Sequence, residues 1–169
     1  MSKRFGKRSR SDAMSDPHPA RLAVDADVLA ADVLVGGDAR DAMDIVRGHS
    51  WVELVASDDL LSDAEAVIRE LADDDLASDW RERIEDLRIR VEQTPGDHPA
   101  LASAHAGNAA HILSYDDSLR SAKTGSALQG RIPVSVKRPD GFVTLFDPES
   151  LYNVVVGGKY PGPDEDARE

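Results

Sequence analysis

The chain has 169 residues, no cysteine and a formal net charge of −12 at pH 7. This length suits one domain with a sizeable core. The lack of cysteine excludes a disulfide scaffold, a cysteine-ligated zinc site and a thiol nucleophile. No stretch approaches the roughly 18 apolar residues of a membrane span, and the start lacks the apolar region of a secretory signal. We therefore expect a cytoplasmic protein with no membrane partner.

The acidic charge has an unusual composition, with 23 Asp against 9 Glu and only 5 Lys against 15 Arg. A surface rich in Asp and poor in Lys is typical of a halophilic protein. In concentrated salt the Debye length is only about 3 Å at 1 M, so like charges hardly repel. Net charge therefore indicates little about partners, and a candidate acidic site must stand out from a background of solvated Asp.

Short apolar runs alternate with helical patterns along the middle of the chain. They predict strands at 22–24, 51–56, 111–114 and 134–136, and helices at 41–47, 57–71, 76–91, 99–106 and 118–128. A turn at 139–141 leads into a last apolar segment at 142–152. Strands that alternate with long helices predict a mainly parallel sheet covered on both faces, a three-layer α/β/α sandwich.

Both ends of the chain are polar and lack apolar periodicity. We expect mobile tails at 1–20 and 158–169 that flank a single domain at 21–157. The first tail is basic, with five Lys or Arg against two Asp, and the last is acidic. The basic tail has two interpretations, contact with nucleic acid phosphates or a solubilising arm.

In an open α/β sheet, ligands bind at the carboxyl ends of the strands. Six acids are predicted near that edge: Asp25 and Asp27 after the first strand, Asp116 and Asp117 after the third, Asp97 before the helix at 99–106, and Glu65 in the helix after the second strand. Clustered carboxylates repel one another, so Mg²⁺ or Mn²⁺ is a natural counter-charge. The alternative for each acid is a helix cap, a turn or a solvated surface position.

Four segments, in order, resemble the PIN domain family. Residues 24–29 (VDADVL) resemble its opening strand and acid, and 57–71 resembles its helix with one inward glutamate. The segment 99–116 resembles its Ala-rich helix, strand and [TS]-x-D motif, here Ser114-Tyr115-Asp116, and 134–142 is similar to its closing strand and helix. The resemblance covers residues 21–150 and implies a PIN-like α/β/α fold.

PIN domains are mostly Mg²⁺- or Mn²⁺-dependent ribonucleases, so the resemblance implies an endoribonuclease acting on RNA. It implies that Asp25, Asp97 and Asp116 hold the metal and that Glu65 ligates it or positions water. Ser114 matches the hydroxyl residue before the last acid and is expected to orient a ligand by a hydrogen bond.

The third acid departs from the family pattern. The usual interval counted back from Ser114 ends at His98, one place after Asp97. Either a one-residue shift lets Asp97 serve, or His98 replaces it, or the site is weakened. Asp27 and Asp117 are further candidates at the same edge.

Three functional alternatives follow. The first is an active nuclease, the second is a catalytically weakened PIN-like module that binds RNA or a protein partner, and the third is a toxin held inactive by a protein inhibitor. The resemblance also implies a homodimer.

Overall fold

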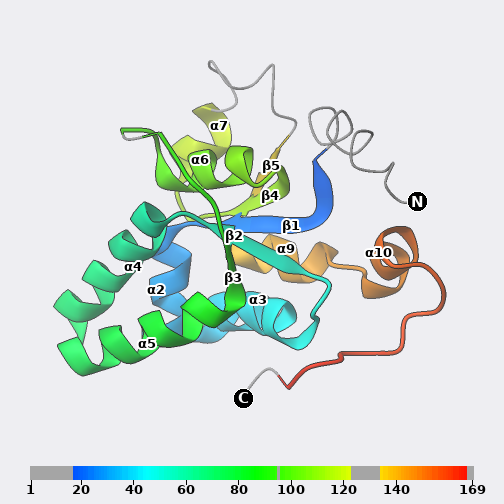
Figure 1. The fold of residues 1–169 in the computed structure, drawn as a ribbon, viewed down its shortest axis with the longest axis horizontal. Coiled ribbons are helices and arrows are strands. Elements are labelled where there is room, and N and C mark those ends of the chain that lie inside the picture. The colour runs from blue at the N-terminus through cyan, green and yellow to red at the C-terminus, as the bar shows by residue number, and fades with distance from the viewer. Residues whose placement is uncertain (1–16, 95, 123–133, 167–169) are drawn as a thin grey trace.

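The computed structural model describes residues 17–94, 96–122 and 134–166, and its centre is a five-stranded parallel sheet (Figure 1). The strand order is β3-β2-β1-β4-β5, and every pair is parallel. The strands are β1 (His18–Val24), β2 (Glu53–Ala56), β3 (Arg88–Arg90), β4 (Ala109–Leu113) and β5 (Ser135–Lys137).

Eight helices in the described residues cover the two faces of the sheet. They are α2 (Ala26–Leu34), α3 (Gly37–Gly48), α4 (Asp58–Leu71), α5 (Asp74–Leu87), α6 (Pro99–Ala106), α7 (Asp117–Ala122), α9 (Pro139–Leu145) and α10 (Pro148–Val155). Figure 1 shows α6 and α7 on one side of the sheet and α2, α3 and α9 on the other. The three-layer α/β/α architecture predicted from the sequence is confirmed.

Alternation along the strands builds two separate cores. Leu22, Val24, Leu54 and Leu113 face the larger core with α2, α3, α4 and α9. Ala23, Val55 and Ile112 face the smaller core, where the Ala residues of α6 pack closely on the sheet. Both faces of the second half of β1 are therefore buried, which is why residues 22–24 are apolar without interruption.

The predicted helix at 76–91 is wrong at its end, because the helix stops at Leu87 and the chain continues as β3. Arg88 enters the sheet opposite Leu54, and its side chain, only 3% exposed, forms ion pairs with Asp58 and Glu85. These partners lie elsewhere in the fold or on the preceding turn, so the strand was not visible in the local pattern.

Two further differences concern helices that the apolar pattern did not predict. Residues 26–34 form α2, whose cap is Asp25, and the predicted turn at 139–141 is the start of α9. Pro139 occupies the first turn of α9, where a missing N–H costs nothing. The predicted helix at 118–128 coincides with α7 at its start, and its residues from 123 onward lie outside the described part of the chain.

The fold includes residues beyond 21–157 at both ends. Strand β1 begins at His18, and the segment after α10 packs against the end of α3. The Tyr160 hydroxyl hydrogen-bonds His49 Nε2 at 2.6 Å, and the Asp164 carboxylate accepts from the Ser50 N–H at 2.8 Å. Of the two predicted tails, residues 1–16 and 167–169 lie outside the described residues.

The described helices are short compared with a membrane span. Among the residues that the structure describes, no helix has the length and apolar character needed to cross a bilayer.

Candidate active site

The central pair of strands, β1 and β4, forms the switch point of the sheet. The chain moves from β1 to β2 and β3 on one side, and β4 and β5 lie on the other. At such a point the connections diverge and leave a crevice at the carboxyl edge, which is the usual ligand site of open α/β sheets. Asp25 follows β1 and Ser114 follows β4, so both residues border this crevice.

Asp25 is held in place by two hydrogen bonds. Its Oδ1 accepts from the Ala26 N–H at 2.9 Å as the cap of α2, and its Oδ2 accepts from the Ser114 hydroxyl at 2.7 Å. The Asp25 side chain is only 14% exposed, and Ser114 is fully buried. From the sequence we expect Ser114 to orient a metal ligand, and in the structure its hydroxyl donates to the candidate ligand Asp25.

Ser114 also connects Asp25 to Asp116. The Asp116 N–H donates to the Ser114 hydroxyl oxygen at 3.0 Å, so one hydroxyl fixes both the carboxylate of Asp25 and the backbone that carries Asp116. The Asp116 carboxylate accepts from the Ser118 hydroxyl and N–H. These bonds lower the pKa of Asp116 and keep it ionised.

Asp27 lies in the same group of acids. Its Oδ2 accepts from the Tyr115 N–H at 3.2 Å, which places it beside the turn that carries Asp116. Desolvation and then the charge of Asp25 raise the pKa of Asp27, with a smaller contribution from Asp116. Asp27 is therefore close enough to Asp25 and Asp116 to be repelled by both carboxylates.

Asp63 is a fourth acid near this group, and the sequence prediction missed it. Desolvation and the charges of Asp59 and Asp25 raise its pKa, whereas His98 lowers it. Asp63 lies one helical turn after Asp59 in α4, which starts at the carboxyl end of β2. In the sequence, the spacing of four residues between Asp59 and Asp63 indicates that the two carboxylates share one face of the helix.

Glu65, predicted to face the site, lies elsewhere on α4. Its carboxylate forms ion pairs with Arg69 at 3.0 Å and with Arg81 of α5 at 2.8 Å. Two residues along a helix correspond to a rotation of about 200°. A helix that turns Asp63 toward Asp25 therefore turns Glu65 toward α5.

His98 lies beside Asp25. It caps α6, with its Nδ1 accepting from the Ala100 N–H at 3.2 Å, and its Nε2 lies 4.0 Å from Asp25 Oδ2. Asp97 is exposed one position earlier, in the turn before the helix. Asp117 is the first residue of α7. The structure thus brings His98 into contact with Asp25 and leaves Asp97 facing solvent.

In the described parts of the chain, no Lys or Arg forms an ion pair with Asp25, Asp27 or Asp116, whereas Asp32, Asp58, Glu65 and Glu85 all have Arg partners. Among all the residues that the structure describes, no three Asp, Glu or His side chains are arranged closely enough to form a metal site. The donors nevertheless fit a hard divalent cation, because they are ionisable oxygens that repel one another.

The chain belongs to DUF7384, a family of unknown function, which matches residues 16–168. Comparison with curated proteins and with solved structures gives no match.

Proposed function

We propose that this member of DUF7384 is a metal-dependent nuclease, an endoribonuclease that hydrolyses RNA phosphodiesters with Mg²⁺ or Mn²⁺. One observation carries the proposal: carboxylates that repel one another gather at the switch point of the sheet, and no Lys or Arg in the described residues pairs with Asp25, Asp27 or Asp116. A divalent cation would relieve that repulsion. The resemblance of residues 21–150 to PIN domains supports the same assignment.

Asp25 and Asp116 are the proposed metal ligands, and Asp27 and Asp63 are the further acids whose pKa values are raised in part by the charge of Asp25. When bound, the metal makes hydroxide available near neutral pH and neutralises charge on the phosphoryl oxygens. The protein's own contribution is orientation, because Ser114 and the Ala26 N–H hold the two oxygens of Asp25. Asp97 and Glu65 remain predicted ligands, although the contacts of Glu65 with Arg69 and Arg81 favour Asp63 over it.

Tyr115 and Arg138 lie beside the acids and suit a nucleic acid substrate. The Arg138 guanidinium is 5.2 Å from the centre of the Tyr115 ring, and Tyr115 is the residue between Ser114 and Asp116. An aromatic face can stack on a base, and an exposed guanidinium can bind a phosphate. In a protein of net charge −12, RNA would be held through the metal and this pair.

The test is cleavage of single-stranded and structured RNA in high salt with Mn²⁺ or Mg²⁺. We expect Asp25→Asn to lower the rate more than about 100-fold, beyond the usual cost of losing a residue that only supports a ligand. Asp86→Asn, which changes an exposed acid of α5, is the matched control and should retain activity. No turnover by the folded protein, or equal turnover by Asp25→Asn, would disprove the nuclease.

One observation favours a second candidate, a catalytically weakened module that binds RNA or a protein. His98 lies beside Asp25 where the PIN resemblance leads one to expect an acid. This candidate predicts RNA binding that survives both EDTA and Asp116→Asn. The nuclease predicts that metal removal abolishes turnover and that Asp116→Asn weakens it.

A further inference from the structure

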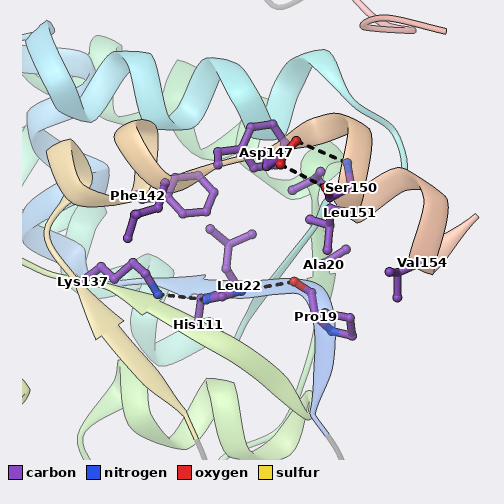
Figure 2. Close-up of a pocket in the computed structure, with 13 residues that line it drawn as sticks. Pro19, Ala20, Leu22, His111, Lys137, Phe142, Asp147, Ser150, Leu151 and Val154 are labelled. Carbon is purple, nitrogen blue, oxygen red and sulfur yellow. Dashed lines mark hydrogen bonds between the residues drawn. The ribbon is translucent and has the colours of Figure 1, made fainter. Parts of the chain in front are cut away.

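A cavity lies away from the acids, on the face of the sheet covered by α9 and α10. It has a volume of about 370 Å³ and lies between β1, β4 and β5 on one side and the two helices on the other (Figure 2). Its walls are mainly apolar, with Ala20 and Leu22 from β1, Phe142 from α9 and Leu151 from α10 among them. This volume is within the range of about 300–1,000 Å³ that is typical of small-molecule pockets.

Lys137 is the cationic group of this pocket. Its ammonium donates to the Ser135 hydroxyl at 2.6 Å and lies 3.4 Å from His111 Nδ1. The other ring nitrogen of His111 lies 3.2 Å from the Pro19 carbonyl oxygen. Since a carbonyl only accepts, Nε2 carries the proton, and Nδ1 is free to accept from Lys137. The neighbours of Lys137 are thus neutral.

The carboxylate of the pocket is already engaged at the helix side. Asp147 caps α10, and its two oxygens accept from the Ser150 N–H at 3.2 Å and the Ser150 hydroxyl at 3.0 Å. Figure 2 shows this pair on the side of the helices and Lys137 with His111 on the side of the strands. No carboxylate in the described residues forms an ion pair with Lys137.

The mouth of the pocket is apolar as well. Leu145 and Val154, both lining residues, are 67% and 73% exposed. On a surface where charged side chains dominate, two exposed aliphatic residues at one cavity indicate a binding surface.

We propose that this pocket binds a small amphipathic carboxylate, with its carboxylate on the Lys137 ammonium and its alkyl or aryl tail against Leu22, Phe142 and Leu151. Charge complementarity selects the head group, because the cation has only neutral partners among the described residues. The apolar walls and mouth select the tail. Burial lowers the pKa of Lys137, and a bound carboxylate would favour its charged form again.

Titration calorimetry of the full chain with butanoate, hexanoate and octanoate tests the proposal. Each added methylene should tighten binding about fourfold until the cavity is filled. Octanol and octylamine, which have similar tails, should bind at least about tenfold more weakly than octanoate, because neither can form the charged hydrogen bond with Lys137.

Substitutions in the pocket distinguish the contribution of the carboxylate head group to binding from that of the apolar tail. Lys137→Met should weaken octanoate about tenfold or more and leave octanol unchanged, whereas Lys137→Arg should retain the preference. Lys159→Met, at an exposed lysine beyond α10, is the matched control and should bind like the native chain. Leu145→Ser should reduce the gain per methylene.

Three results would overturn the proposal. They are no octanoate binding at millimolar concentration, equal affinity for octanoate, octanol and octylamine, and a dimer that dissociates in Leu145→Asp while no probe binds. The last result would assign the surface to a second copy of the chain. None of these outcomes depends on the nuclease proposal.

Discussion

The same two strands carry two regions of opposite chemistry, three residues apart. Leu22 of β1 is opposite His111 of β4 and lies in the apolar pocket, whereas Asp25 and Ser114, three residues further along each strand, belong to the acidic site. Three residues along a strand span about 10 Å. The first pair lies under α9 and α10 and the second lies where the strands end, so position along the strand decides which chemistry each pair supports.

The two regions share one property, uncompensated charge. Elsewhere arginines pair with the acids, as where Arg88 lies between Asp58 and Glu85. At the edge, Asp25 and Asp27 have no such Arg or Lys in the described residues, and in the pocket Lys137 has no carboxylate there. Groups kept partly from water without a counter-ion are costly, so they indicate places where a ligand supplies the missing charge.

After the loss of Asp25 itself, the largest effect is expected at Ser114, whose hydroxyl contacts both Asp25 and the Asp116 N–H. Ser114→Ala should lower cleavage about 10- to 100-fold and raise the Mn²⁺ concentration needed for half-maximal rate, because Asp25 and the Asp116 N–H both lose a partner. Ser103→Ala is the control, since this equally buried hydroxyl accepts from the Ser57 N–H instead of donating to an acid of the site. Equal rates and Mn²⁺ dependence in both variants would contradict the role of Ser114.

A second prediction contrasts the two faces of the sheet. On the face of α6, a Cβ at Gly107 would lie 2.7 Å from Val55 Cγ1, and Val55 is a buried strand residue that has little freedom to move. Gly107→Ala should therefore lower the free energy of unfolding by about 1–3 kcal/mol in a urea titration.

Gly141→Ala provides its control. This glycine lies in α9, and apart from its chain neighbours and the backbone of its own helix no heavy atom of the described structure lies within 4 Å of the position that an added methyl group would take. The substitution should be neutral or stabilise by up to about 1 kcal/mol. A neutral result at Gly107 would show that the α6 face has the same spare volume as the pocket face.

The pocket face should accept added methyl groups. Ala20 is buried at the cavity, and Ala20→Val fills part of it with a residue that strands favour. We expect a gain of about 0.5–1 kcal/mol in thermal or urea unfolding, together with weaker octanoate binding. A loss of stability with unchanged binding would mean that the methyl groups do not enter the cavity.

The smallest effect is expected at Asp27. Its pKa is raised in the folded protein, so its contribution to stability is complete below the ordinary value of 3.8 and is lost as pH rises through the folded pKa. In EDTA at pH 7, Asp27→Asn should raise the free energy of unfolding slightly, by at most about 0.5 kcal/mol after solvent screening, as measured in a urea titration.

The pH dependence of the stability difference tests whether repulsion from Asp25 causes it. The advantage of Asp27→Asn should disappear below about pH 3.8, where the native carboxyl is neutral in both states. Mn²⁺ should stabilise the native chain more than the variant. An advantage that persists in acid would show that repulsion from Asp25 is not its source.

Much of the edge region was predictable from local pattern. The strand ends located Asp25, Ser114 and Asp116, and the sandwich followed from the alternation of strands and helices. The choice between Asp63 and Glu65 depended on the rotation of α4 about its axis, and that between Asp97 and His98 on which residue caps α6. Both choices depend on the angle at which a helix is rotated about its axis when it packs on the sheet. A stripe of apolar residues defines that angle only to within part of a turn.

The pocket was not predictable in the same way. His111 and Lys137 lie 26 positions apart and meet only because β5 pairs with β4 beyond the segment 123–133. Likewise β3 pairs with β2, and Arg88 at its start bonds Asp58, which is 30 positions away in the sequence. Local pattern was enough for the class of fold and for the acids at the strand ends, because apolar periodicity and strand termination involve neighbouring residues. Only the tertiary structure decided which charged side chains lack an ion-pair partner, because the partners that neutralise a charge are distant in sequence.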